Sequence, residues 1–291
     1  MALAANLAIA LAKLVAFLFT GSSAMLAEAA HSLADSCNEL VLLRGGARAA
    51  QPASADHPFG YGGFRFFNAF LVAMGIFTLG GVFALYEGVH RLLDRRPVEQ
   101  PTWAIGVLLL SMALEGFSLH TAVTRAQQLR AGRGWWQFIR TTKTPDLAVV
   151  LLEDFGALVG LAFALVGVGV AVLTGDGLWD GIGTLGIGVL LVAIAAVLAR
   201  ETRSLLLGEA AGAPIVRQIE SALTAPEQVV RACDLRTMHL SPDQLLVVAV
   251  LEFGPALPGP DLVAAIEDAA QRVRDAVRYD CLIYLQPRLP H

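Results

Sequence analysis

Residues 24–43 of the chain, AMLAEAAHSLADSCNELVLL, are long enough to span a membrane and carry a histidine and an aspartate four positions apart. In a helix these positions share a face, so His31 and Asp35 direct an imidazole nitrogen and a carboxylate toward one point. A carboxylate near the membrane centre costs about 2.5 kcal/mol or more, and such groups usually mark an ion path. Imidazole with carboxylate suits a divalent ion such as zinc. The alternative is a polar pair that bonds neighbouring helices.

The composition indicates that this stretch belongs to a membrane protein. The 291 residues are 56% hydrophobic and 16% charged, whereas soluble domains average about 25% charged residues. A net charge of −4 gives no indication of a nucleic-acid partner. Cys37, Cys233 and Cys281 form no C-x-x-C pair, so we expect reduced thiols. The first apolar run leads directly into the next one, which predicts a retained helix rather than a cleaved signal.

Hydropathy predicts six spans, each close to the roughly 20 residues that a bilayer requires. They cover residues 3–20, 22–43, 67–93, 103–125, 145–173 and 178–206. The first three and the last two are strongly apolar, whereas Glu115 and His120 interrupt the fourth. Basic residues gather after spans two and four, which places both termini in the cytoplasm by the positive-inside rule. Arg91, Arg95 and Arg96 run against this rule but are outnumbered.

The character of the sequence changes near residue 208. Helical spacing at 215–223 and 260–277 alternates with strand patterns at 229–240, 245–253 and 281–285. The order α-β-β-α-β predicts a small layer of helices on a sheet. The predicted fold is therefore an α-helical membrane protein with a six-helix domain at 1–207 and a cytoplasmic, ferredoxin-like α+β domain at 208–291.

Five motifs in order carry a family resemblance. They are GSSAMLAEAAHSLAD at 21–35, ADHPFGYG at 55–62, PDLAVVLLED at 145–154, WDGIG at 179–183 and LLLGEA at 205–210. With the predicted architecture, they resemble the cation diffusion facilitator family, and the last three resemble the branch that includes the animal mitochondrial zinc exporter. This resemblance implies a homodimeric antiporter that moves a divalent metal out of the cytoplasm against protons.

The resemblance also implies a transport site with two ligands four residues apart on span two and two more on span five. His31, Asp35 and Asp154 match three of these positions. Val150 stands at the fourth and cannot bind metal, so water would complete the coordination. The metal ligands predicted here are therefore His31, Asp35 and Asp154.

Three further residues are candidates for supporting roles or for a proton path. Glu153 points about 100° away from Asp154 around the helix and is either a direct ligand or a group facing another helix. Asn38 lies about one turn beyond Asp35 and is a candidate for holding a ligand in place. Glu115 is either a proton carrier or a structural bond to another span.

Two other metal sites that the resemblance implies are expected to be absent. In the loop after span two, the matching positions hold Ser54, His57 and Tyr61, so one ligand of three remains. In the last domain, Ala265, Tyr284 and Gln286 replace the regulatory ligands, and His239 is a lone imidazole. We therefore expect a dimerisation domain that needs no zinc.

The sequence thus predicts proton-coupled efflux of divalent cations, zinc first, by a homodimer in a lipid bilayer, in a bacterial inner membrane. The predicted protein is not an enzyme, requires no cofactor and binds no nucleic acid. Manganese or ferrous iron is the alternative cargo, since two carboxylates and an imidazole accept both. A non-transporting scaffold and an intramembrane metal enzyme, in which such a site activates water, are the alternative functions.

Overall fold

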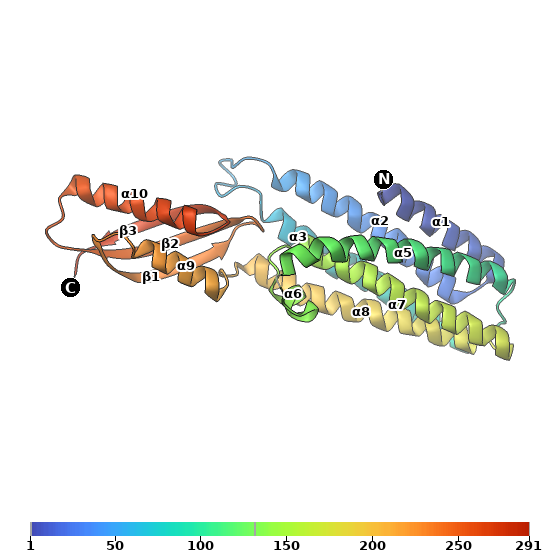
Figure 1. Cartoon of the computed structure of the whole chain (residues 1–291). Coiled ribbons are helices and arrows are strands. Elements are labelled where there is room, and N and C mark those ends of the chain that lie inside the picture. The colour runs from blue at the N-terminus through green and yellow to red at the C-terminus, as the bar shows by residue number, and fades with distance from the viewer. Residues whose placement is uncertain (1, 131, 291) are drawn as a thin grey trace. The chain divides into compact units, whose positions relative to one another are not determined.

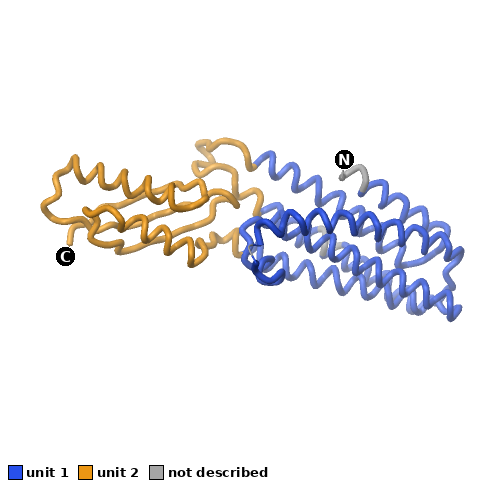
Figure 2. Tube along the Cα trace, viewed as in Figure 1, with its two compact units in different colours: residues 1–48, 67–203 blue, residues 49–66, 204–291 orange. Residues whose placement is uncertain are grey.

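A computed structural model describes residues 2–130 and 132–290, with side chains described outside residues 2–5, 76, 77 and 79 (Figure 1). The chain divides into two compact units (Figure 2). The first contains residues 1–48 and 67–203, and the second contains residues 49–66 and 204–291. The second unit thus includes the loop that follows the second predicted span. The predicted domain boundary at residue 207 stays a prediction.

The first unit is built from helices. They are α1 (Ala2–Thr20), α2 (Ser23–Ala49), α3 (Phe64–Leu71), η1 (Val72–Phe77), α4 (Thr78–Leu93), α5 (Pro101–Arg130), α6 (Trp135–Thr141), α7 (Pro145–Thr174) and α8 (Leu178–Leu207). The segment η1 is a π-helix that joins α3 to α4 without a break. The division between the units falls inside two helices, so that residues 64–66 of α3 and residues 204–207 of α8 belong to the second unit.

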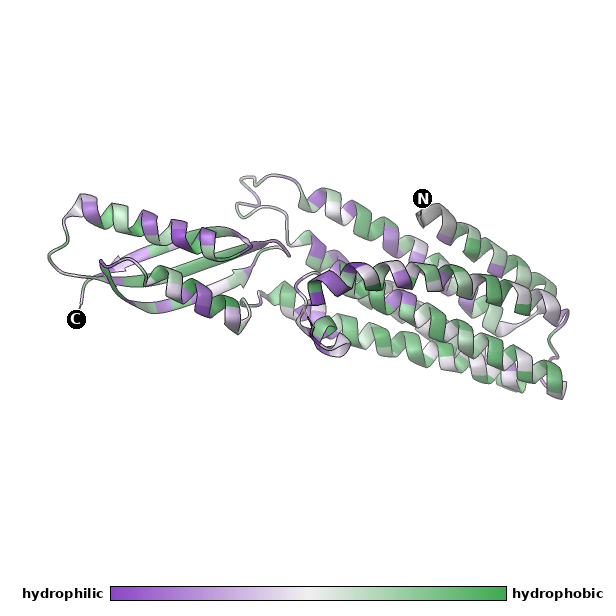
Figure 3. Cartoon of the chain, viewed as in Figure 1, coloured by the Kyte–Doolittle hydropathy of each residue, from purple (hydrophilic) through white to green (hydrophobic). Residues whose placement is uncertain are grey.

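In the first unit, whose ribbons are mainly green in Figure 3, four described helices are long and apolar enough to cross a membrane. They are Phe64–Leu93, Pro101–Arg130, Pro145–Thr174 and Leu178–Leu207. In α1, residues Asn6–Thr20 are apolar but form a shorter stretch. The expectation that the second span is more apolar than the fourth is wrong, because α5 belongs to this group and, among the described residues, α2 does not. The polar side chains of α2 lower its hydropathy, and they supply the candidate site below.

The carboxylate of Asp180, at the start of α8, holds the connection between α1 and α2. It accepts hydrogen bonds from the Ser22 hydroxyl at 2.6 Å and from the Ser23 backbone N–H at 2.8 Å. The Nε of Arg91 on α4 lies 3.4 Å from the same carboxylate. Asp180 is fully buried. It therefore acts as an N-cap for α2 from another helix and joins three helices at one end of the bundle.

The helices α7 and α8 approach each other through glycine. A Cβ atom added at Gly183 would lie 2.7 Å from the carbonyl oxygen of Phe163, and one added at Gly167 would lie 2.8 Å from that of Trp179. Real Cβ atoms do not come this close, so these two glycines allow the backbones to touch. This close contact fixes α7, which carries two of the candidate acids, against α8.

The second unit contains a three-stranded sheet in the order β1-β2-β3. Its elements are α9 (Ala213–Leu223), β1 (Val229–His239), β2 (Gln244–Phe253), α10 (Gly259–Ala276) and β3 (Asp280–Arg288). The strand β2 pairs antiparallel with β1 and parallel with β3. The predicted α-β-β-α-β order is confirmed. Alternate residues of β2, from Leu245 to Phe253, pack under α9 and α10, while Leu246, Val248 and Val250 lie on the opposite face.

Replacing Asp180 by alanine should destabilise the helix bundle by about 3 kcal/mol or more, because the change removes a buried cap and leaves the Arg91 charge without its partner. Unfolding of the purified protein in a detergent titration measures the loss. The matched control is Asp94→Ala, which breaks an exposed pair whose Arg96 Nε lies 2.9 Å from the Asp94 carboxylate. That change should cost less than about 1 kcal/mol. Equal losses in both variants would contradict the role assigned to Asp180.

Candidate metal centre

One face of α2 carries four buried polar side chains. Glu28, His31, Asp35 and Asn38 follow one another at spacings of three, four and three residues, which places them along a single stripe. Each is at most 5% exposed. The Nδ1 atom of His31 lies 3.5 Å from an Asp35 carboxylate oxygen, too far for a strong hydrogen bond. The stripe therefore presents an imidazole and carboxylates to the neighbouring helices, as the i,i+4 spacing of His31 and Asp35 predicts.

The two adjacent acids of α7 point to different helices. Glu153 faces α2, where its Oε1 lies 3.4 Å from the Asn38 amide nitrogen and its carboxyl lies close to that of Asp35. Asp154 instead faces α5 and accepts a hydrogen bond of 3.0 Å from the Ser118 hydroxyl. The structure thus brings Glu153, rather than Asp154, to the stripe of α2. This follows from the turn of about 100° between adjacent residues of a helix.

The contact between Asp35 and Glu153 has a chemical consequence. Two carboxylates that lie close together repel each other, and a proton or a cation between them relieves this repulsion. A proton between like-charged oxygen atoms occupies the place that a cation would take. The contact between α2 and α7 is therefore suited to bind either a proton or a metal ion.

The predicted ligands are not assembled into a closed coordination shell. Within residues 2–130 and 132–290, no group of three or more His, Cys, Asp or Glu side chains is arranged to hold a metal. Val150, at the missing fourth position, packs in an apolar cluster with Phe138 and Leu151. The assignment of His31, Asp35 and Asp154 as joint ligands stays a prediction.

Glu115 and Lys13 add further buried charge to the same bundle. Glu115 on α5 is buried and lies within electrostatic range of Asp154, Glu28 and Lys13. Lys13 on α1 lies 3.0 Å from the Glu28 carboxylate. Neither Lys13 nor Glu28 is among the site residues predicted from the sequence. The signal was present, because Lys13 is a lone cation in an apolar run and Glu28 precedes His31 by one turn.

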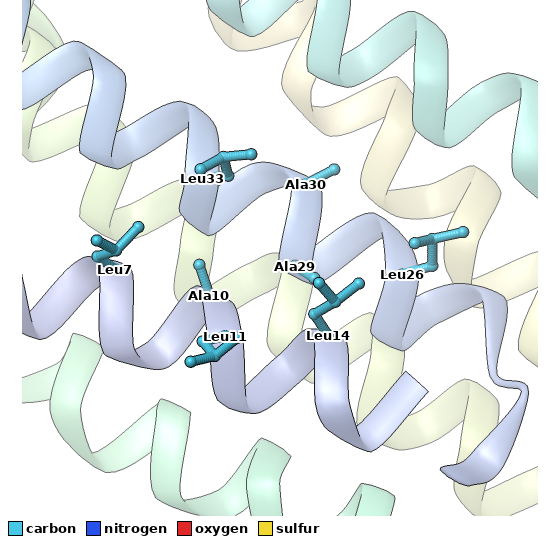
Figure 4. Close-up of a pocket in the computed structure, with 8 residues that line it drawn as sticks. All are labelled: Leu7, Ala10, Leu11, Leu14, Leu26, Ala29, Ala30 and Leu33. Atoms are coloured by element: carbon cyan, nitrogen blue, oxygen red, sulfur yellow. The ribbon is translucent and has the colours of Figure 1, made fainter. Parts of the chain in front are cut away.

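The pocket between α1 and α2 has no polar donor. It has a volume of about 500 Å³. Side chains from both helices line it, as Figure 4 shows: Leu7, Ala10, Leu11, Leu14, Leu26, Ala29, Ala30 and Leu33. All eight side chains are hydrocarbon, so this pocket cannot bind an ion. The candidate metal centre lies instead on the polar stripe of α2.

The residues at the two other metal sites that the family resemblance implies, in the loop after α2 and in the last domain, contact ordinary protein groups. The Ser54 hydroxyl lies 3.0 Å from the Tyr61 hydroxyl, and the ring of His57 stacks on that of Tyr61 with centroids 4.3 Å apart. In the second unit, buried His239 meets Tyr279 edge to face. Ala265 is buried under the sheet, whereas Tyr284 and Gln286 are exposed.

Comparison with known proteins relates the chain to metal transporters. The model of the cation efflux transmembrane domain matches residues 1–207. A mitochondrial proton-coupled zinc antiporter of Xenopus laevis, SLC30A9, is 31% identical over 243 residues, which cover 83% of this chain and 44% of the relative. An uncharacterized transporter of Synechocystis, sll1263, is 30% identical over 90% of this chain and 81% of its own length. Metal tolerance protein C4 of Arabidopsis thaliana is 28% identical over 80% of this chain and 52% of the relative. The chain thus spans less than half the length of the zinc antiporter.

Removing the Ser118 hydroxyl tests the role of Asp154. If Asp154 is a metal ligand, it must leave the Ser118 hydroxyl to reach α2. Ser118→Ala should therefore strengthen Zn²⁺ binding to the purified protein by roughly tenfold, because a hydrogen bond to a charged carboxylate contributes about 1.5 kcal/mol. Isothermal titration calorimetry measures the affinity. The matched control is Thr121→Ala on the same helix, whose hydroxyl bonds only to the Phe117 carbonyl at 3.0 Å. Equal affinities in the wild type and both variants would exclude this role for Asp154.

Proposed function

This chain belongs to the cation efflux family, and from that premise we propose that it exports a divalent metal, zinc first, from the cytoplasm in exchange for protons. Membership identifies a membrane transporter rather than an enzyme. The similar antiporter of Xenopus laevis carries zinc with protons, which supports the choice of cargo. The chain spans less than half of that relative, so we propose this activity for the chain and do not transfer it from the relative.

The observation that carries the proposal is the polar stripe of α2, where the Nδ1 atom of His31 lies 3.5 Å from the Asp35 carboxylate. Glu153 faces this stripe from α7, with its Oε1 3.4 Å from the Asn38 amide nitrogen. Metal binding requires deprotonated carboxylates and a neutral imidazole, so a metal and protons compete for one set of side chains. When a metal binds, protons on these carboxyl groups must leave. When protons return, the metal loses its ligands. This exclusive occupancy couples metal efflux to proton entry.

We assign His31, Asp35 and Asp154 as metal ligands, with Glu153 as the candidate for the fourth ligand that Val150 cannot supply. Glu153 already contacts Asp35, whereas Asp154 must turn from Ser118 toward α2. A shift of α7 against α2 would exchange these contacts and change the access of the site, as rocking transporters do. Asn38 holds Glu153, and Glu115 is the candidate for carrying a proton along α5.

The remaining parts of the proposal concern topology and assembly. We propose six spanning helices, with α1 and α2 added to the four strongly apolar ones, in a bacterial inner membrane with both termini in the cytoplasm. Buried charges on α1 and α2 reduce hydropathy without preventing a span, because they face other helices. We propose that residues 1–207 transport the metal and residues 208–291 dimerise. The open sheet face of the second unit, with Leu246, Val248 and Val250, is an apolar surface that a second copy would cover.

Transport is tested in sealed proteoliposomes with an acidic interior. Zinc, manganese and ferrous iron are offered outside, to the wild type and to Asp35→Asn. We expect zinc uptake that depends on the pH gradient and falls at least tenfold in the variant, because the amide cannot replace a charged ligand. Asp94→Asn, in an exposed loop, is the control and should transport normally.

Each other result has a defined meaning. Uptake of manganese or iron without zinc would keep the antiport and change the cargo. Uptake that ignores the pH gradient would exclude proton coupling. No uptake of any ion by folded protein would exclude the transporter and leave the scaffold.

Dimerisation through the open sheet face is tested separately. Val248→Lys places a charge at its centre and should convert the detergent-solubilised dimer to a monomer, since a buried unpaired charge opposes association. Light scattering after size-exclusion chromatography measures the mass. Val263→Lys on α10, which is also exposed, serves as the control and should leave the mass unchanged. A dimer in both variants would exclude this face.

A further inference from the structure

Lys13 is a fully buried cation in the membrane domain. Its ammonium donates to the Glu28 carboxylate at 3.0 Å and to the Ser32 hydroxyl at 2.7 Å. Lys13 and Glu28 are both 0% exposed. Two oppositely charged groups in a medium of low dielectric attract strongly, and each would be very costly to bury alone. The pair therefore joins α1 to α2 as a neutral unit.

This pair lies next to the proposed metal ligands. Ser32 directly follows His31, and Glu28 precedes His31 by about one turn on the same helix. The Lys13 charge lies within electrostatic range of His31, Asp35 and Glu115. A positive charge at this position repels a divalent cation that approaches His31 and Asp35. Within a protein interior this repulsion is far stronger than in water.

Glu28 is also held toward α7. A Cβ atom added at Gly160 would lie 2.7 Å from Glu28 Oε1, so the glycine makes room for the carboxylate. This Oε1 atom is buried and has no hydrogen-bond partner among the residues that the structure describes, whereas Oε2 accepts from Lys13. The negative charge of Glu28 thus lies between Lys13 and α7, the helix that carries Asp154.

Resting on the proposed function, we propose that Glu28 is an affinity-determining residue for the transported metal, because it neutralises the Lys13 ammonium beside His31 and Asp35. Glu28 does not bind the metal in this arrangement. It acts through Lys13, and its contribution is to remove the repulsion that an unpaired ammonium exerts on a divalent ion. Lys13 in turn occupies the Glu28 carboxylate and so keeps it from binding the metal.

The test compares the KM for zinc in proteoliposomes across a set of neutralising variants. Glu28→Gln leaves Lys13 uncompensated and should raise the KM by roughly tenfold or more. Lys13→Met/Glu28→Gln removes both charges and should return the KM to within about threefold of the wild type. If the effect of Glu28→Gln came from lost packing, the second substitution would raise the KM further. If it comes from the uncompensated charge, the second substitution should restore the KM.

A second pair of variants tests the case in which Lys13 loses its proton once Glu28 is replaced, so that the KM of Glu28→Gln stays unchanged. An unpaired buried lysine can become neutral, whereas arginine stays charged. Lys13→Arg keeps a neutral pair with Glu28, and Lys13→Arg/Glu28→Gln leaves a permanent cation. The KM should differ between these two variants by roughly tenfold or more.

The control is a variant that leaves a buried cation without its partner at a distance from the proposed metal ligands. Asp180→Asn leaves buried Arg91 without its carboxylate, at the α2 terminus rather than beside the ligands. It should lower stability while the KM of the folded protein changes less than about threefold. Zinc flux with equal KM in all variants would overturn this inference and leave the proposed function intact. Absence of zinc flux in the wild type would overturn both.

Discussion

Every charge buried in an apolar helix bundle must meet a partner, and this constraint organises the membrane domain. The carboxylate of Asp180 meets Ser22, Ser23 and Arg91 at one end of the bundle. Deeper along α2, Lys13 meets Glu28 and Ser32. Desolvation makes an unpaired member of either set costly by several kcal/mol. The partners therefore determine which helices are neighbours and how α2 is rotated about its axis.

In α2, the buried polar side chains that need partners from other helices are also the ones that form the candidate metal centre. Its stripe of four buried polar residues makes it too polar to be recognised as a membrane span by hydropathy alone, among the residues that the structure describes. It remains in the bundle because α1, α7 and α8 supply the complementary groups. The stripe also bears the side chains that we propose to bind the cargo. The groups that lower the hydropathy of α2 are thus those that give it a function.

The family motifs separate into structural and functional parts. In the motif at 21–35, the two serines bond to Asp180 of the WDG motif, whereas His31 and Asp35 belong to the candidate metal centre. In the motif at 145–154, Glu153 and Asp154 point to different helices. These motifs therefore combine residues that hold the helices together with residues that we propose to bind the metal.

By itself, the sequence determined the class of the protein and much of its layout. Hydropathy and length indicated a helical membrane domain, and residue patterns predicted the α-β-β-α-β order of the second unit. The 3.6-residue period was enough to place His31 and Asp35 on one face of α2. Only the tertiary structure decided the partners of these residues, because contacts between helices depend on how each helix is rotated and packed against its neighbours. That Glu153 meets Asp35, that Asp154 meets Ser118 and that Lys13 meets Glu28 are facts of this packing. Spacing within one helix holds no information on groups supplied by another.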